Sequence, residues 1–167
     1  MASTYTPIAT TTLGSAAASY TFSSIPSTYT DLVLVASLNG SSGTAIKVQF
    51  NSDTGTNYSL TRLVGDGVSA TSSQQSNSSS IIYGSNGIPT AANQFAPVIM
   101  HIQNYANTTT YKTMLSRFNN ANSSLGSTDA IVGLWRSTSA INAVKVEANS
   151  GNFSTGSTFT LYGVLSA

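Results

Sequence analysis

The stretch AIKVQF, residues 45–50, decides the fold class of this chain. Its apolar residues Ile46, Val48 and Phe50 alternate with polar ones. Side chains alternate between the two faces of an extended strand, so this period of two predicts a β-strand with one buried face and one face in water. The residues that follow, NSDTG at 51–55, are of the types that favour a turn.

Other segments along the chain have the same strand character. Residues 31–38 (DLVLVASL) and 96–105 (APVIMHIQNY) are apolar on both faces, which places them at the centre of a sheet, beneath a second layer or beneath a neighbouring subunit. Later strands are expected at 109–118, 129–135, 141–148 and 157–165. Apolar residues never follow helical spacing for three turns. The pattern predicts an all-β fold, an antiparallel β-sandwich or jelly roll of about eight or nine strands.

The 167 residues fit a single domain, expected at 15–167. Residues 1–14 (MASTYTPIATTTLG) are expected to form an extended N-terminal arm. Residues 65–94 are expected to form a long exposed loop in which only SIIY, at 80–83, has strand character. Loops of this length inside compact domains are usually functional or held by a partner.

The composition excludes several classes of function. Only 7% of the residues are charged, and Ser, Thr, Asn and Gly fill the polar positions. The six basic residues are scattered singly, so no basic stripe exists for nucleic acid. No cysteine is present for disulfides or thiolate metal sites. No segment resembles an export signal or a membrane span, and a membrane partner is not expected.

The turn that follows the first strand has some features of a cation-binding loop. Asn51, Asp53 and Gly55 occupy alternate positions, as the ligands of an EF-hand do. That motif ends in a bidentate Glu at its twelfth position, where this chain has Arg62. The favoured interpretation is a turn in which Asn and Asp side chains satisfy local backbone groups. Whether a cation binds at 51–57 stays open.

No residue pattern predicts catalysis. His101 is the sole histidine, and strand alternation points it away from Met100 and Ile102. A catalytic triad needs a base that touches both a carboxylate and a nucleophile, and no spacing selects such a trio. The five acidic residues are also distributed singly. We expect a half-buried, hydrogen-bonded histidine, no enzymatic activity, no catalytic residue, no bound metal and no cofactor.

Two groups of residues are candidates for contacts. Arginines beside apolar strand residues suggest bidentate ion pairs with aspartates, inside the fold or across a subunit boundary, with ligand contacts as the alternative. The residues concerned are Arg62, Arg117, Arg136, Asp31, Asp66 and Asp129. Aromatic rings fill cores and interfaces but also stack on sugars. Trp135 is expected in the core or an interface, whereas Tyr83 and Tyr105, beside loops, are candidate partner or ligand contacts.

Three segments together resemble small virion proteins of tailed bacteriophages. They are YTFSSIPSTYTDLVLVASL (20–38), VQFNSDTGTNYSLTRLVGDG (48–67) and GSTFTLYGVLSA (156–167). Proteins of this group are β-sandwich or jelly-roll modules that decorate or cement capsids, or that form fibre and adhesin domains of tails. No catalytic residue is carried over by the resemblance.

The resemblance implies a role in assembly within the virion, after synthesis in the bacterial cytoplasm. The leading expectation is a homotrimeric decoration or cement protein on the head exterior, in contact with the major capsid protein or other virion proteins. The arm at 1–14 would then pair with the shell or a neighbouring subunit by strand addition. The alternative is a tail-fibre or tail-tip module that recognises host surface glycans.

Overall fold

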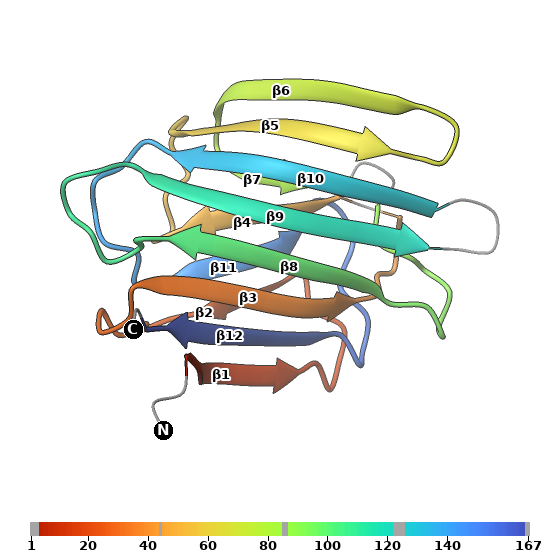
Figure 1. Cartoon of the computed structure of the whole chain (residues 1–167). Coiled ribbons are helices and arrows are strands. Elements are labelled where there is room, and N and C mark those ends of the chain that lie inside the picture. The colour runs from red at the N-terminus through yellow and green to blue at the C-terminus, as the bar shows by residue number, and fades with distance from the viewer. Residues whose placement is uncertain (1–3, 44, 85–86, 122–125, 166–167) are drawn as a thin grey trace.

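The computed structural model describes residues 4–43, 45–84, 87–121 and 126–165. These residues form twelve strands and no helix, arranged as two antiparallel sheets of eight and four strands. In Figure 1 the larger sheet lies in front and the smaller one behind it. The predicted all-β antiparallel sandwich is confirmed, with twelve strands in place of eight or nine.

The eight-stranded sheet joins segments from the whole length of the chain. Its order is β1 (Tyr5–Thr12), β12 (Thr158–Val164), β3 (Asp31–Leu38), β8 (Ala96–Gln103), β9 (Lys112–Ala121), β10 (Gly126–Trp135), β5 (Tyr58–Gly65) and β6 (Ala70–Ser78). Because the first strand pairs with the last, the two ends of the chain lie on the same side of the molecule (Figure 1). β3 and β8 lie inside the sheet, as their two apolar faces predicted.

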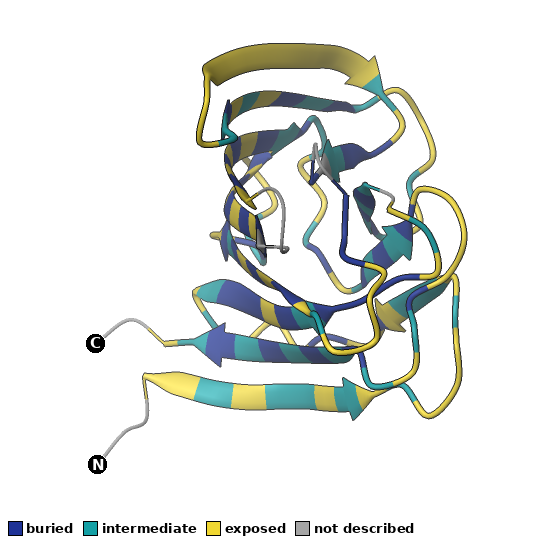
Figure 2. Cartoon of the chain, turned by 90° about the vertical axis from the view of Figure 1, so that its right-hand side faces the viewer, coloured by how far each residue is buried: buried dark blue, intermediate teal, exposed yellow. Residues whose placement is uncertain are grey.

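The four-stranded sheet covers only part of the larger one. Its order is β2 (Ser19–Phe22), β11 (Val144–Ala148), β4 (Ile46–Phe50) and β7 (Ile81–Tyr83). Figure 2 shows the sandwich from the side, with the large sheet strongly twisted and β6 exposed along its length at one end. One face of the large sheet therefore meets the small sheet, and we call it the inner face. The opposite face is the outer face.

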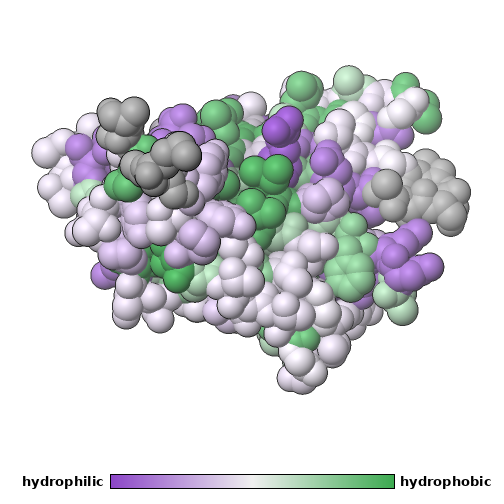
Figure 3. Space-filling model, turned by 60° about the horizontal axis from the view of Figure 1, so that its bottom comes forward, coloured by the Kyte–Doolittle hydropathy of each residue, from purple (hydrophilic) through white to green (hydrophobic). Residues whose placement is uncertain are grey.

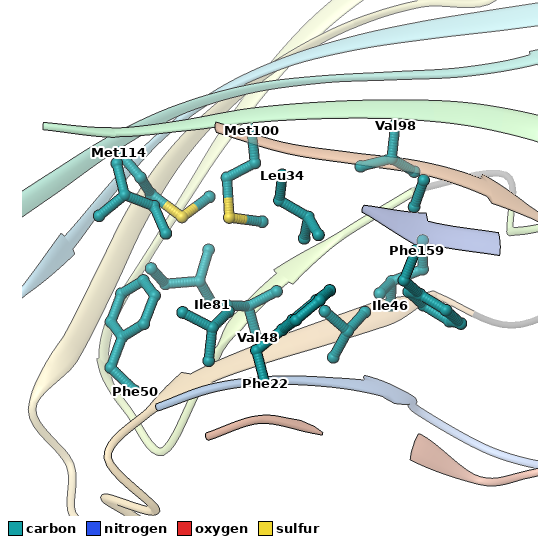
Figure 4. Packing of buried hydrophobic residues seen from close by; sticks show 14 of the residues in the cluster. Phe22, Leu34, Ile46, Val48, Phe50, Ile81, Val98, Met100, Met114 and Phe159 are labelled. Atoms are coloured by element: carbon teal, nitrogen blue, oxygen red, sulfur yellow. The ribbon is translucent and has the colours of Figure 1, made fainter. Parts of the chain in front are cut away.

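The core lies between the inner face and the small sheet. As the alternation predicted, Ile46, Val48 and Phe50 of β4 are buried, with at most 1% of their surface exposed. Figure 4 shows them meeting residues of the large sheet such as Leu34 and Met100. Burying side chains of this size is the main favourable term in folding, at about 1.5–3 kcal/mol each.

Two predicted segments have a different structure. Residues 70–78, placed in the long exposed loop, form β6. Their side chains are polar and almost all exposed, so the strand has no hydrophobic alternation, and backbone pairing with β5 alone defines it. Within the predicted arm, residues Tyr5–Thr12 form an edge strand that pairs with β12 of the same chain on one side. Pairing of its other side with a neighbour stays a prediction.

Candidate functional site

Apolar side chains are exposed across the middle of the outer face. Five adjacent strands, β3, β8, β9, β10 and β5, each contribute one large apolar residue that is 39–56% exposed. We call this set the apolar stripe; in strand order it consists of Val35, Ile99, Leu115, Val132 and Leu63. The registers make Ile99 the partner of Val35 and Val132 the partner of Leu115, so the side chains lie close together.

Four of the five residues of the apolar stripe, all except Val35, line an open groove of about 740 Å³ on the outer face. Tyr5 of β1, Val33 of β3, His101 of β8 and Arg117 of β9 contribute to its lining. Figure 3 shows apolar patches on a surface that is otherwise mostly pale, the colour of weakly polar residues. Binding sites in proteins are commonly concave surfaces of this size with a mainly apolar lining. The few polar groups in the lining fix the orientation of whatever binds.

His101, which lines this groove, forms a polar pair with Asp31. The His101 Nε2 atom lies 2.9 Å from Asp31 Oδ2, and the imidazole side chain is 39% exposed. The backbone amide of Asn104 donates to the other carboxylate oxygen at 2.7 Å. The prediction of a half-buried, hydrogen-bonded histidine is confirmed. Within the part of the chain that the structure describes, no hydroxyl hydrogen-bonds to this imidazole, so no nucleophile–base pair is formed there.

The three arginines occupy different parts of the molecule. Arg117 points outward from β9 into the groove, whereas Arg62 faces inward from β5 and is partly buried. Arg136, just beyond β10, donates to the carbonyl of Thr56 at 2.8 Å and to Asn77 Oδ1 at 3.1 Å. Between described residues of one chain no arginine forms an ion pair. Pairs across a subunit boundary stay a prediction.

The aspartates named with these arginines have other partners. Asp66 accepts hydrogen bonds from the backbone amides of Ser69 and Val68, which lower the pKa of its carboxyl group. Asp129 is fully buried on the inner face and accepts the Gly84 amide at 3.2 Å. Among the described residues, the salt bridges between lysine and a carboxylate join Glu147 of β11 to Lys47 and Lys145.

The segment at 51–57 is a turn, as predicted. Asp53 Oδ1 accepts the Gly55 amide at 2.8 Å, and Oδ2 accepts Asn57 Nδ2 at 2.9 Å and Trp135 Nε1 at 2.7 Å. The bond from Trp135 is the largest cause that lowers the pKa of this carboxyl group. Asn51 has a φ of 51° and holds the loop before β11 through its side-chain amide. Among the described residues no three His, Asp or Glu side chains are grouped as metal ligands would be.

The aromatic candidates lie inside the molecule. Trp135 is 2% exposed and stacks on Tyr58 with ring centroids 6.3 Å apart, so the expectation of a core residue is confirmed. Tyr105 is fully buried and its hydroxyl donates to the Pro26 carbonyl, so its predicted role as a surface contact is wrong for this chain. The backbone of Tyr83 pairs with Ile46 in the small sheet, while its side chain lies outside the described residues.

Most of the apolar stripe was not singled out by the sequence. The two-sided apolar character of 31–38 and 96–105 indicates Val35 and Ile99, but Leu115, Val132 and Leu63 are single apolar residues on the mainly polar face of their strands. The available indication was that each of them occupies a position that alternates with the buried residues of its strand.

Comparisons with models of protein families, with curated proteins and with solved structures give no match. No described helix could span a membrane.

Proposed function

We propose that this protein is a structural assembly module that packs against a neighbouring protein through the outer face of its large sheet. Within this class, we propose a decoration or cement protein of a bacteriophage head, assembled as a trimer against the major capsid protein or other virion proteins. The observation that carries the proposal is the apolar stripe, with one exposed apolar side chain from each of five adjacent strands. The resemblance of 20–38, 48–67 and 156–167 to virion proteins supports its placement.

The energetics favour covering this surface. Monomeric proteins rarely expose contiguous apolar patches larger than a few hundred Å², and the largest patch on a protein is often an interaction site. The five side chains of the apolar stripe are each about half exposed, and covering half of such a side chain stabilises a complex by about 1 kcal/mol. The total of several kcal/mol would offset part of the cost of holding two proteins together.

The rest of the surface suits close packing of many copies. With 7% charged residues, a contact through Ser, Thr and Asn side chains removes few ions from water. Hydroxyl and amide groups hydrogen-bond directly or through bridging water at little cost. An apolar centre with a neutral polar rim is the common composition of protein interfaces.

The experiment that tests the outer face compares two substitutions on one strand. Leu115 and Thr113 both point outward from β9, but only Leu115 belongs to the apolar stripe. Leu115→Asp is expected to weaken self-association of the full chain by tenfold or more, measured by sedimentation over a range of concentrations. Thr113→Asp places the same charge one row away and is the control. Equal effects of the two substitutions, or a wild type that is monomeric at every concentration, would contradict assembly through this face.

The place in the virion is tested separately, by electron microscopy. An antibody against the full chain, applied to purified particles of the phage that encodes it, is expected to label the head exterior. Labelling confined to the tail would contradict the head assignment and favour a receptor-binding module. Particles that carry no label at all would contradict a virion role.

A further inference from the structure

The strand β6 is an open edge of the large sheet. It pairs with β5 on one side, and the order of the sheet ends with it. Its nine residues, Ala70–Ser78, read ATSSQQSNS and contain neither a charged residue nor a proline. The first eight are exposed and the last is partly exposed. Along its free side, the backbone N–H and C=O groups have no hydrogen-bond partner within the described chain.

The other three sheet edges are protected in ways that β6 is not. β1, the opposite edge of the large sheet, carries Pro7 and a register shift between Pro7 and Ala9. The edges of the small sheet, β2 and β7, are four and three residues long. Short strands, prolines, bulges and charges are the devices by which proteins prevent unwanted edge pairing. β6 is regular from Ala70 to Gln75, with one shift near its end, and the absence of protection indicates an edge that is used.

We propose that β6 pairs antiparallel with β6 of a second copy, so that the two large sheets join into one continuous sheet across a two-fold axis. A second copy is the occupant that the residues favour, because a two-fold contact requires a self-complementary surface. Ser, Thr and Gln both donate and accept hydrogen bonds, so a neutral strand of these residues matches itself. A strand with charges of one sign would repel its own copy.

The surroundings of β6 leave room for the partner strand. Thr71, Ser73 and Gln75 point toward the inner side of the sheet, yet all three are exposed because the small sheet ends before it reaches them. Figure 2 shows β6 projecting clear of the remaining strands. The inference rests on the proposed function and deepens it, since it names a second surface, separate from the apolar stripe. A two-fold contact cannot form inside a trimer, so it would join copies from different trimers.

A cysteine scan of the full chain tests the pairing. The sequence has no cysteine, so a single introduced thiol has only its own copy as a disulfide partner. Across a two-fold axis one residue of β6 faces itself, with Cα atoms about 4.5–5.5 Å apart, which is within disulfide reach. Among single cysteines at 71 to 75, one position is expected to cross-link at least tenfold faster than its neighbours. A cysteine at Thr12, on the protected edge β1, is the control.

The pairing of β6 with its own copy is then tested without covalent chemistry. Ser72→Lys and Ser73→Lys place charges that repel across the axis and are expected to lower the dimer affinity at least tenfold, while Thr12→Lys leaves it unchanged. Circular dichroism checks that the variants remain folded. A cross-linking profile that is flat at the level of Thr12→Cys, or an affinity that the lysines do not change, overturns the proposal. Pairing of β6 only with a segment of another protein would give that flat profile in the purified chain.

The contact through the β6 edge and the contact through the outer face can be tested independently of each other. If the scan is repeated in the Leu115→Asp background, a retained peak supports the edge contact whatever happens to association through the outer face. A flat profile in a wild-type chain that still associates through Leu115 overturns the β6 contact alone.

Discussion

The inner and outer faces of the large sheet carry apolar side chains of similar size, but only the inner face is covered. Met114 and Leu115 are neighbours on β9; the first is 1% exposed beneath the small sheet, and the second is 48% exposed on the other side. At this position, covering by the small sheet and not the kind of side chain distinguishes the two faces. The inner contact is made when the chain folds, and the outer face is the one that we propose a partner covers.

The inner face is also not purely apolar. Lys112, on the same strand, is 1% exposed, and its Nζ donates to the carbonyls of Thr110 at 2.7 Å and Thr138 at 3.2 Å. Desolvation lowers the pKa of this ammonium group, as burial of a cation must. A hydrogen-bonded cation is thus buried within the fold while leucine and valine side chains stay in contact with water. The comparison supports the view that the outer face serves assembly and contributes little to folding.

The largest difference between the two faces is expected from truncation of the two neighbours on β9. Met114→Ala leaves a cavity in the core and should lower the free energy of unfolding by about 2–5 kcal/mol. Leu115→Ala should change it by about 1 kcal/mol or less in the dilute monomer, because this side chain is already 48% exposed and leaves no enclosed cavity. Denaturant unfolding of the full chain measures both. Equal losses would mean that the outer face is part of the folding core.

A smaller effect is expected at Gly133 of β10, where the small sheet approaches closely. A Cβ atom there would lie 2.7 Å from Ile81 of β7 and 2.9 Å from Met114. Gly133→Ala should therefore destabilise the chain by about 1–3 kcal/mol through overpacking. Gly65→Ala is the matched control in β5, where the nearest side-chain atom would be 3.8 Å away. If both glycines tolerate alanine, the two sheets pack less tightly on the inner face than the structure indicates.

The fold follows from the sequence wherever burial gives a strand its own periodicity. β3 was predicted with the bounds that the structure has, because apolar residues define it on both faces. β6 was missed because its polar residues carry no period, and only pairing with β5 makes it a strand. The N-terminal sequence predicts only an extended arm for a related reason: its polar, threonine-rich residues give no indication of which sheet edge it joins.

The candidate site was less predictable than the fold, because it is assembled by register. Whether Leu115 lies beside Val132 depends on how β9 pairs with β10, and one strand's sequence does not contain that information. For the same reason the position of Tyr105 beside a loop suggested exposure, although the core reaches that end of the sandwich and buries its ring. Asp53 and Trp135, 82 residues apart, meet through the same packing.

Alkaline pH should act through the inner face. Burial raises the pKa of Tyr58 to about 12, and its hydroxyl lies 3.0 Å from the Phe50 amide, which donates to it. Because the pKa in the folded chain exceeds the ordinary tyrosine value of 10.0, this stability is fully present below pH 10 and is lost as pH rises toward 12. The difference in unfolding free energy between wild type and Tyr58→Phe should shrink by about 2 kcal/mol between pH 9 and pH 12. A constant difference would contradict burial of this hydroxyl.

The smallest effect on folding is expected from His101, on the outer face. Its hydrogen bond to Asp31 is partly exposed, and such pairs contribute about 0–1 kcal/mol, so His101→Ala should barely change the unfolding free energy. The same side chain lines the groove beside the apolar stripe, and its removal should change the association constant more than it changes stability. Sedimentation and denaturant unfolding of the one variant compare the two quantities. A substitution on the inner face is expected to do the opposite, lowering the unfolding free energy more than the association constant. A His101→Ala variant that unfolds easily yet associates normally would therefore contradict the role of the outer face in assembly.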